Sequence, residues 1–424
     1  MEKNRFFPAI VAVVIAGSFA AGLFEPELRA QGGLPEVLSN IRPSASNRDL
    51  DPMTTYNRVL RIIQERSYGE TLPDLQLTYR AISGLLNSLD DPYTRFLDPV
   101  GYRGLKEENS GEFEGIGAQL SNQLTREGYV RIFRPLPNGP ALKAGIRKGD
   151  LITKVDGKSV VGMQVDDAVK IIRGKAGTVV RLTIKRPGEP KPFDVAITRA
   201  PVEFEIVNAV MKDEKNKIGY ISLAQFNEMA YPKVERAYRE LERQGMRGLI
   251  LDLRGNPGGL LDAAIDISSL FIPAGRDAVV IVEAGGDREV RKTSGRKYLL
   301  KVPLVVLVNR TSASASEIVA GAVKDNNAGT VVGTTTFGKG LVQTVVPLSV
   351  NNSASMITTA KYLNPSGKDI NRSREQRGGV EPDVIVEMTE EEFLAGKDPQ
   401  LQKALEIAAQ QSGRGPGSRA TSAR

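Results

Sequence analysis

The sequence predicts a multidomain α/β protein. The chain has 424 residues, which is enough for about two to four domains. Its hydrophobic period changes from helical to strand-like near residue 112, and strands alternate with helices from about 200 to 388. Apolar, β-branched strands between helices are typical of a layered α/β core. We therefore expect small modules that precede one larger α/β core.

The first 30 residues resemble an export sequence. Lys3 and Arg5 precede an apolar run from Phe6 to Phe24. This run is longer than a typical signal-peptide core and close to the minimum that spans a bilayer. Ala30 suits a cleavage site, whereas Leu28, two positions earlier, does not. We therefore expect residues 1–30 to be a signal peptide or an N-terminal membrane anchor, with a buried helix as the alternative. Cleavage and retention both remain open.

A linker and a helical module follow. Residues 31–50 carry Gly, Pro, Ser and Asn with little apolar content, which predicts a linker. Apolar residues then recur at helical spacing over 56–63 and 82–89, and the stretch "DDPYTRFLDP" (90–99) ends the second helix. We expect a small helical module over residues 51–110.

Residues 111–199 predict a compact binding module. Short apolar runs alternate with Gly, Pro and Asp turns, and one helix carries apolar residues on one face over 165–172. The hairpin "AGIRKGDLITKVDGKSV" (144–160), together with Gly115, Ile116 and Gly117, resembles a bacterial, permuted PDZ domain. The resemblance implies that the backbone N–H groups of this triplet bind the terminal carboxylate of a peptide, which pairs with a strand edge.

Composition excludes several kinds of chemistry. The chain contains neither Cys nor His, so disulfides, the usual zinc sites and Ser-His-Asp triads are impossible. The net charge of +7 is spread along the chain rather than gathered in a basic stripe, so we expect no nucleic-acid partner. Catalysis would have to use hydroxyl, amine, phenol, carboxyl or backbone groups, and we expect no metal and no cofactor.

The stretch "NRTSASASEIVAGA" (309–322) places serines at the start of a predicted helix. Ser314 and Glu317 have the spacing of a capping box, which would stabilise the helix by about 1 kcal/mol. The same position suits a nucleophile, because free N–H groups and the helix dipole stabilise an oxyanion. Both interpretations remain open, and spacing does not choose among Ser312, Ser314 and Ser316.

The stretch "TTTFGKGLVQ" (334–343) offers a base. Lys339 can accept a proton only if its pKa falls by about 3 pH units from ~10.4, and burial without a carboxylate partner lowers it in this way. The alternative is a turn lysine in solvent. Gln343 has the same strand parity but lies about 13 Å along an extended chain. Contact between the two would require a kink or bulge at Gly340, and a half-exposed strand residue is the alternative.

The stretch "LILDLRGNPGG" (249–259) ends a strand in a glycine loop, which exposes backbone N–H groups. Gly258 or Gly259 is a candidate for one oxyanion donor, and the N–H of Ala315 is a candidate for the other. A plain turn between strand and helix is the alternative. We expect Asp252, inside the strand, to be a buried structural acceptor.

Together these stretches, with "DPYTRFL", resemble the carboxy-terminal processing peptidases, or tail-specific proteases, over about residues 50–388. The resemblance implies a ClpP/crotonase-like core over 200–388 with an inserted PDZ domain. It implies Ser314 as nucleophile, Lys339 as general base and Gln343 as the residue that orients the lysine. The stretch "NRSREQRGGVEPD" (371–383) departs from the family pattern. We expect it to lie away from the motifs.

The implied function is an exported serine endopeptidase of the periplasm or cell envelope, free or anchored to the inner membrane. It would hold unstructured, apolar C-terminal tails in its PDZ domain and cleave through an acyl-enzyme. Arg173, at the end of the PDZ helix, is a candidate for coupling the two domains, with a plain surface arginine as the alternative. We expect a short helix and a disordered tail over 389–424. A homo-oligomer and an activating adaptor protein are left open.

Two rival functions are an inactive PDZ scaffold and a crotonase-like enzyme that acts on thioesters. An inactive copy has no reason to keep Ser314, Lys339 and Gln343 together. A thioester enzyme would need neither an export sequence nor a tail-binding module.

Overall fold

The computed structural model describes residues 51–413, apart from 296, 349–350, 374–376, 390 and 393–394. The predicted export sequence (1–30), the linker (31–50) and the tail after 413 therefore lie outside the described residues. The chain divides into two compact units, one that ends at Leu77 and one that begins at Thr78. Within the described part of the chain, no helix is both long and apolar enough to cross a membrane.

The two predicted N-terminal helices are present. Helix α4 (Pro52–Arg66) belongs to the first unit, and α5 (Asp74–Asn87) contains the boundary between the units. The division therefore falls inside the predicted helical module. The apolar faces are open: Val59 in α4 is 50% exposed and Leu85 in α5 is 69% exposed. Helical spacing thus predicted the helices but not a buried face.

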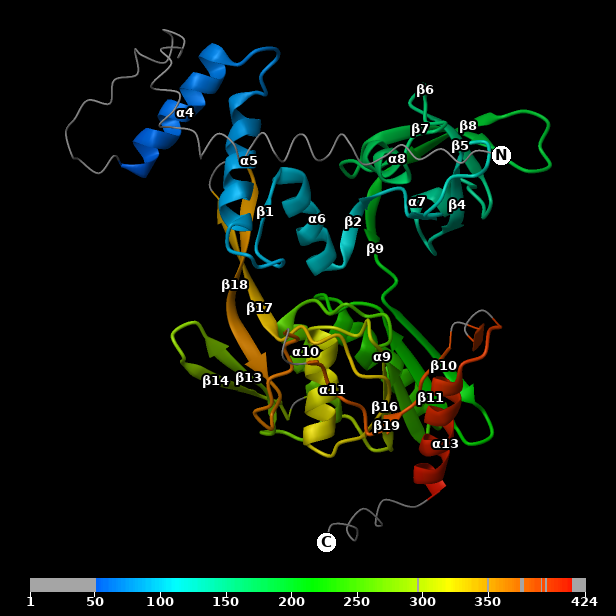
Figure 1. The fold of residues 1–424 in the computed structure, drawn as a ribbon. Coiled ribbons are helices and arrows are strands. Elements are labelled where there is room, and N and C mark those ends of the chain that lie inside the picture. The colour runs from blue at the N-terminus through cyan, green and yellow to red at the C-terminus, as the bar shows by residue number, and fades with distance from the viewer. Residues whose placement is uncertain are drawn as a thin grey trace, which may run out of the picture. The chain divides into compact units, whose positions relative to one another are not determined.

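The predicted binding module contains a six-stranded antiparallel sheet (Figure 1). Its strands follow the order β3-β4-β5-β7-β8, and β6 pairs with β5. Its elements are β3 (Ala118–Leu120), β4 (Val130–Pro135), α7 (Pro140–Lys143), β5 (Leu151–Val155), β6 (Lys158–Ser159), α8 (Val165–Ile172), β7 (Val179–Lys185) and β8 (Phe193–Thr198). Ile132, Ile152 and Leu182 are fully buried in its own core. The alternation of apolar and polar residues along each strand produces this core.

Two short segments enclose this module in the chain. After β1 (Arg95–Leu97) and α6 (Pro99–Ser110) comes β2 (Glu112–Gly115), which pairs antiparallel with β9 (Ala200–Glu203). The chain therefore enters and leaves the module through neighbouring strands.

The C-terminal half is built on a six-stranded sheet in the order β10-β11-β12-β15-β16-β19. All its pairings are parallel except that of the edge strand β10. The strands are β10 (Val207–Asp213), β11 (Ile218–Leu223), β12 (Gly248–Asp252), β15 (Leu304–Val308), β16 (Thr330–Gly333) and β19 (Val384–Ile385). The predicted layered α/β core is thus confirmed.

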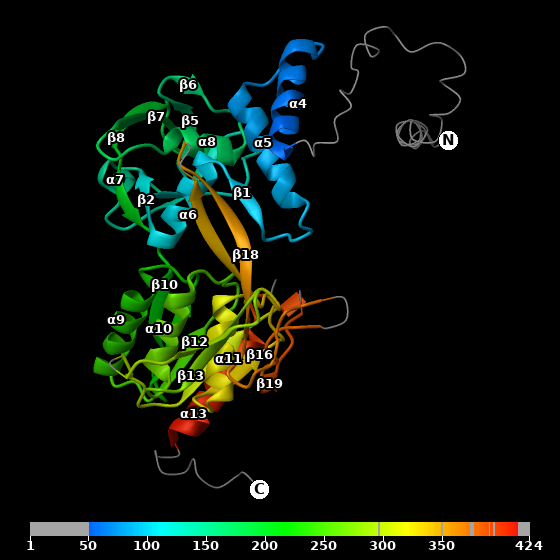
Figure 2. The ribbon, with the colours of Figure 1, turned by 90° about the vertical axis from the view of Figure 1, so that its left-hand side faces the viewer.

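Helices cover both faces of this parallel sheet. Leu249 and Leu251 of β12 face a core shared with α9 (Ala230–Arg243), α10 (Leu261–Phe271) and α11 (Ala315–Asp325). Ile250, between them, faces the core shared with α13 (Pro399–Gly413). Burial of each such side chain contributes about 1.5–3 kcal/mol, which is why both faces of β12 are apolar. Figure 2 shows α11 beside β16, in agreement with their contacts.

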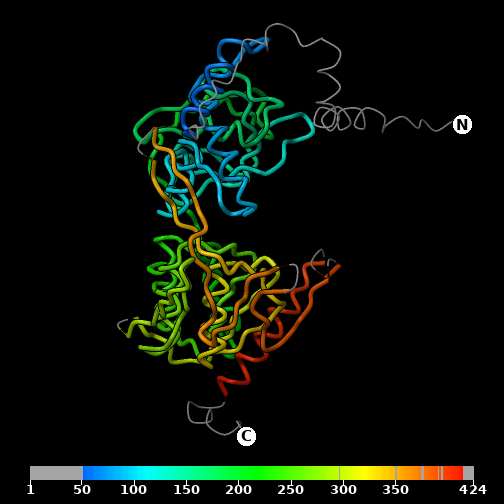
Figure 3. The backbone as a smooth tube through the Cα atoms, turned by 60° about the vertical axis from the view of Figure 1, so that its left-hand side comes forward, coloured from blue at the N-terminus to red at the C-terminus, as the bar shows by residue number. Residues whose placement is uncertain are grey.

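A second, five-stranded antiparallel sheet was not expected. Strands β13 (Asp277–Glu283), β14 (Arg288–Lys292), β17 (Leu341–Leu348) and β18 (Ser353–Leu363) join β1 in this sheet. The alternation of strands and helices predicted a single layered core over residues 200–388. The half-exposed pattern of β17 explains the difference, because antiparallel strands can keep one face in water. Figure 3 shows β17 and β18 as a long hairpin, whose pairing runs along its whole length.

Candidate active site

Ser314 is the residue before α11, directly after the loop that follows β15. The flanking serines are fully buried and hydrogen-bonded to carbonyl groups. Ser312 Oγ donates to the Leu253 oxygen at 2.8 Å, and Ser316 Oγ donates to the Asn256 oxygen at 3.0 Å. Ser314 is only half-buried. Ser312 and Ser316 therefore fasten the loop, and Ser314 is the serine that solvent or a substrate can reach.

The backbone of Ser314 is strained. Its φ of 53° and ψ of −114° lie where side chains other than glycine are rare, at a cost of about 1–3 kcal/mol. Two partners hold it there. The Glu317 carboxylate accepts the Ser314 N–H at 2.8 Å, and the Tyr362 hydroxyl lies 3.0 Å from the Ser314 carbonyl oxygen. The first contact is the glutamate half of the predicted capping box.

Glu317 joins the serine loop to the lysine loop. Its carboxylate is fully buried and also accepts hydrogen bonds from Thr336 Oγ1 at 2.6 Å, Gly338 N–H at 2.7 Å and Lys339 N–H at 2.9 Å. Burial raises the pKa of Glu317, and these hydrogen bonds oppose the increase. Sequence reasoning assigned Glu317 only a capping role, and the S-x-x-E spacing was the available signal.

Tyr362 makes a second bridge between the same two loops. Its hydroxyl lies 2.6 Å from the Lys339 carbonyl oxygen as well as near that of Ser314, so its single proton is shared between them. The side chain is almost fully buried, and burial raises its pKa well above the usual value. Nothing in the sequence pattern indicated this role, because Tyr362 lies in a different strand, β18.

Lys339 lies in the loop between β16 and β17. Its side chain is half-buried, and burial lowers the pKa of the amine, with a further decrease from Arg95. Asp91 and Glu317 oppose this decrease. The Nζ atom lies 4.5 Å from the centre of the Tyr93 ring. Within the described residues, no hydrogen bond joins Lys339 Nζ to Ser314 Oγ. The structure therefore brings the two loops together, but their reactive atoms are not in contact.

Gln343 contacts β18 rather than Lys339. Its Nε2 atom donates to Thr358 Oγ1 at 3.3 Å. The pairing of β17 with β18 shifts register between Val342 and Gln343, so the chain does bulge, but at this point rather than at Gly340. The structure places Gln343 close after the lysine loop, where its hydrogen-bond partner is Thr358.

The glycine loop after β12 lies against the start of α11. Gly258 has a φ of 104°, and an added Cβ would stand 2.8 Å from Ser314 Cβ and 3.0 Å from the Ala315 nitrogen. The predicted proximity of the two candidate oxyanion donors is thus present. The Gly258 N–H donates to Asn256 Oδ1 at 2.9 Å, so this donor is engaged within its own loop. Gly259 forms a bridge to Phe226.

Asp252 is the buried acceptor that we expected. It accepts hydrogen bonds from the Tyr220 hydroxyl at 2.8 Å and from Arg254, which also pairs with Asp398 just before α13. Burial raises the pKa of Tyr220, and the Asp252 charge raises it further. Arg254 thereby fastens the glycine loop to the C-terminal helix, a role that sequence reasoning missed.

The stretch 371–383 does not lie away from the motifs, so that expectation was wrong. The Gly340 N–H donates to Asn371 Oδ1 at 3.3 Å, and the Arg372 N–H donates to the Gly338 oxygen at 2.9 Å. The Val380 N–H donates to Thr336 Oγ1 at 2.7 Å. The segment returns along the lysine loop because glycines on both sides allow close backbone approach.

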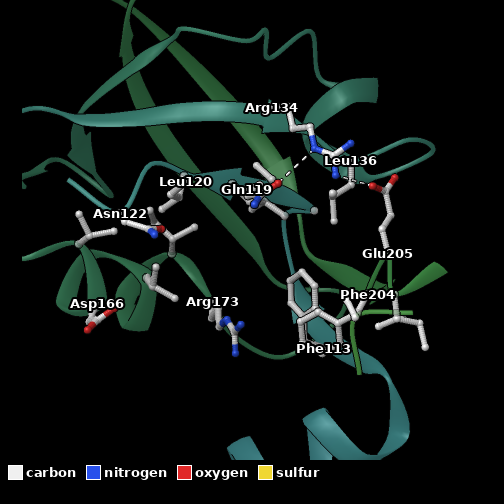
Figure 4. Close-up of a pocket in the computed structure, with 18 of the residues that line it drawn as sticks. Phe113, Gln119, Leu120, Asn122, Arg134, Leu136, Asp166, Arg173, Phe204 and Glu205 are labelled. Carbon is white, nitrogen blue, oxygen red and sulfur yellow. Dashed lines mark hydrogen bonds and ion pairs between the residues drawn. The ribbon is translucent and has the colours of Figure 1, made fainter. Parts of the chain in front are cut away.

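A cavity of about 490 Å³ lies where the PDZ-like module meets the start of the core (Figure 4). Ile116 and Gly117 line it from the module, and Phe204 and Glu205 line it from the segment that leads into the core. Gly115 does not line it and pairs with Ala200 instead. The cavity therefore includes two of the three predicted carboxylate-binding residues.

Two arginines border this cavity. Arg134 Nη2 and Glu205 are 2.6 Å apart, and Arg134 Nε donates to Gln119 at 3.1 Å, as the dashed lines in Figure 4 show. Arg173 follows α8, pairs with Glu107 of α6 at 2.8 Å and lies over the Phe113 ring. Arg173 is thus not a free surface arginine: it joins the PDZ helix to α6 and to β2.

Comparison with known proteins agrees with this geometry. The model of peptidase family S41 matches residues 217–386, and that of the PDZ domain matches 132–186. The carboxy-terminal processing protease CtpA of Bacillus subtilis (strain 168) is 37% identical over 387 residues, which span 91% of this chain and 78% of that protein. The chloroplastic C-terminal processing peptidase of Tetradesmus obliquus is 39% identical, over 72% of this chain and 67% of that protein.

A solved structure shows the same fold. The putative S41 protease from Bacteroides fragilis NCTC 9343 has a TM-score of 0.53 at 16% identity, over 86% of this chain and 98% of that one. The predicted peptidase core, its serine protease class and the PDZ domain are confirmed. The chain therefore belongs to the carboxy-terminal processing proteases of peptidase family S41.

Proposed function

We propose that this protein is an exported endopeptidase that holds the C-terminal tail of a substrate in its PDZ domain and cleaves it with a Ser314–Lys339 pair. One observation carries the proposal. The only one of three clustered serines that is not fully buried lies at a helix start, and Glu317 and Tyr362 fasten its loop to that of a lysine with a lowered pKa.

The reaction uses protein groups and water. Neutral Lys339 Nζ takes the proton of Ser314 Oγ as that oxygen attacks the peptide carbonyl carbon. The resulting oxyanion is bound by the N–H of Ala315 and by one from Gly258 or Gly259. Protonated Lys339 then donates its proton to the leaving amine. Water attacks the ester, again with Lys339 as base, and Ser314 is restored.

Two local movements are required for this reaction. The Lys339 side chain has to turn from the Tyr93 ring to Ser314, and the Gly258 N–H has to leave Asn256 Oδ1 if it is to serve as a donor. Removal of one oxyanion donor typically costs about 100- to 1,000-fold in kcat, so this second movement matters. Gln343 orients the turned lysine in this proposal, and its place on the bulged strand β17 supports that role.

Tail recognition rests on the cavity beside the PDZ helix. Its lining combines Ile116 and Gly117 with apolar side chains and with Arg134, which suits an extended apolar peptide that ends in a carboxylate. Phe204 and Glu205 reach it from the peptidase side, so an occupant would contact both domains. Arg173 pairs with Glu107 of α6, and α6 contacts β18 of the core, which supports a role for Arg173 in coupling tail binding to the core.

Export to the periplasm or cell envelope rests on the sequence of residues 1–30, as does anchoring to the inner membrane. A homo-oligomer and an activating adaptor protein are compatible with the proposal and are not required by it.

Proteolysis is tested with an unstructured protein that has an apolar C-terminus. The wild type, Ser314→Ala and Lys339→Ala are each incubated with it, and intact-mass analysis follows the products. Only the wild type should shorten the substrate. Lys301→Ala, at an exposed lysine, is the matched control and should cleave normally.

A substrate whose last residues are aspartates should be cleaved poorly if the PDZ domain selects the tail. Cleavage by Ser314→Ala at the wild-type rate would refute the nucleophile. Tail binding without any cleavage by the wild type would favour the scaffold function instead.

A further inference from the structure

The amine of Lys339 lies against an aromatic face rather than against its proposed partner. Its Nζ atom is 4.5 Å from the centre of the Tyr93 ring, within the range of a cation–π interaction. This interaction attracts the ammonium form and not the neutral amine. The ring is half-buried, so water screens the contact only in part. Tyr93 therefore favours the form of Lys339 that cannot act as a base.

The segment that carries Tyr93 is fastened beside Gln343. Asp91 accepts the Tyr93 N–H at 3.0 Å and the Thr94 hydroxyl at 2.6 Å. The Thr358 N–H in turn donates to Thr94 Oγ1 at 3.0 Å, and Thr358 is also the partner of Gln343. Strand β1 then continues along β18. These contacts hold the backbone of the Tyr93 segment in place independently of Lys339.

Several charged or titratable groups act on this pair. Asp91 and Arg95 come from the Tyr93 segment, and Glu317 comes from α11. Arg372, from the segment after β18, also acts on Tyr93, and Tyr93 in turn acts on Tyr362. Burial, Asp91 and Glu317 raise the pKa of Tyr93, so its hydroxyl stays protonated at neutral pH. The ring therefore acts through its face and not through a phenolate charge.

We propose that Tyr93 is a positioning residue that holds protonated Lys339 on its ring and away from Ser314. This inference rests on the proposed Ser-Lys mechanism. When the amine loses its proton to solvent, the attraction to the ring disappears and the side chain is released toward Ser314. Tyr93 thus sets the fraction of enzyme molecules in which neutral Lys339 is in contact with Ser314.

The substitutions that separate the ring face from other effects are Tyr93→Phe and Tyr93→Leu. Phenylalanine keeps the face and removes the hydroxyl. Leucine removes the aromatic face and keeps an apolar, shorter side chain beside Lys339. The strength of a cation–π contact predicts that the lysine titrates about 0.4 to 1.5 pH units lower in Tyr93→Leu than in Tyr93→Phe.

The first measurement does not depend on proteolysis. In a Ser314→Ala background, the rate at which an amine-reactive anhydride labels Lys339 is followed against pH by peptide mass analysis. Tyr93→Leu should shift the labelling curve to lower pH. The curves of Tyr93→Phe and of the Ser314→Ala background should coincide with each other at higher pH. Coincidence of the Leu and Phe curves, or a shift to higher pH, would overturn the proposal even if the enzyme is a Ser-Lys peptidase.

The second measurement is the pH profile of kcat/KM in the active enzyme. At pH values below the midpoint of the acidic limb, kcat/KM of Tyr93→Leu should be about 2- to 30-fold higher than that of Tyr93→Phe. This ratio is the same pH shift expressed as a rate. Tyr102→Leu, which removes another lysine–tyrosine contact, should leave the limb in place. Loss of activity in Tyr93→Leu without any change in the limb would indicate a merely structural role, and thermal unfolding would then reveal it.

Discussion

Glu317→Gln is the most informative single change at the junction of the two loops. Each carboxylate oxygen accepts two hydrogen bonds: Oε1 from Thr336 and Gly338, and Oε2 from Ser314 and Lys339. Glutamine has the same shape but only one acceptor oxygen. Its NH₂ group must therefore face two donors, whichever way the amide is turned.

The less costly orientation of the amide can be derived from these contacts. The Thr336 hydroxyl can accept as well as donate, so the NH₂ group would face Thr336 and Gly338. The Gly338 N–H then loses its acceptor inside the protein, which costs about 1–3 kcal/mol, and the charge-assisted bonds weaken as well. We expect a total loss of about 2–4 kcal/mol. For a domain of about 150–250 residues, which is the size of the core over 200–388, this corresponds to a decrease of about 4–16 °C in Tm.

Glu317→Gln should also reduce the cleavage rate strongly, even at temperatures where the protein stays folded. The Ser314 backbone is strained and Glu317 holds it, so a weaker bond allows the loop to relax. A misplacement of about 1 Å can cost about 100-fold in rate. Calorimetry and tail-substrate cleavage measure the two effects, with Glu289→Gln, at an exposed glutamate, as the control. A Glu317→Gln protein with unchanged Tm and unchanged kcat would refute the role assigned to Glu317.

Three further outcomes are expected. Gly258→Ala should reduce the cleavage rate at least about 100-fold, because the new Cβ would stand 2.8 Å from Ser314 Cβ and the backbone φ is 104°. The control Gly275→Ala has open space around its new Cβ and should stay active. Equal activities of the two variants would contradict this expectation. Lys339→Met should stabilise the protein at pH 7. Folding lowers the pKa of Lys339, so the unfolded wild type binds more protons than the folded one up to about pH 10.4. The extra unfolding free energy of Lys339→Met should therefore vanish as the pH rises past that value. A pH-independent difference in unfolding free energy between the two proteins would argue against a buried amine. Arg254→Lys should lower the hydrogen-exchange protection of α13, because lysine cannot form paired hydrogen bonds with both Asp252 and Asp398. Unchanged protection would show that α13 is held without the Arg254 contacts.

Much of the core could be predicted because its signals are local. Continuously apolar strands between helical segments predict a sheet that is covered on both faces, as Leu249, Ile250 and Leu251 show. The start of α11 followed from the S-x-x-E spacing. The lowered pKa of Lys339 agrees in direction with the burial that a lysine base requires.

The remaining features depend on contacts between distant parts of the chain. Ser312 and Ser316 are distinguished from Ser314 only by the Leu253 and Asn256 carbonyl groups, about 60 residues earlier. Tyr93 meets Lys339 across nearly 250 residues. No periodicity encodes such contacts. The second sheet was missed because strands such as β17, with half-exposed alternation, were assigned to the same layer as the fully buried β15.

The dependence of Ser314 reactivity on Lys339 is the central claim, and a serine-directed fluorophosphonate measures it directly. The rate at which this reagent modifies Ser314 is determined from pH 5 to pH 11 in the wild type and in Lys339→Met. The wild type should show a single rise with pH, with a midpoint below the ordinary lysine pKa, and Lys339→Met should show a slow rate without that rise. Equal rates and equal pH profiles in the two proteins would contradict the account.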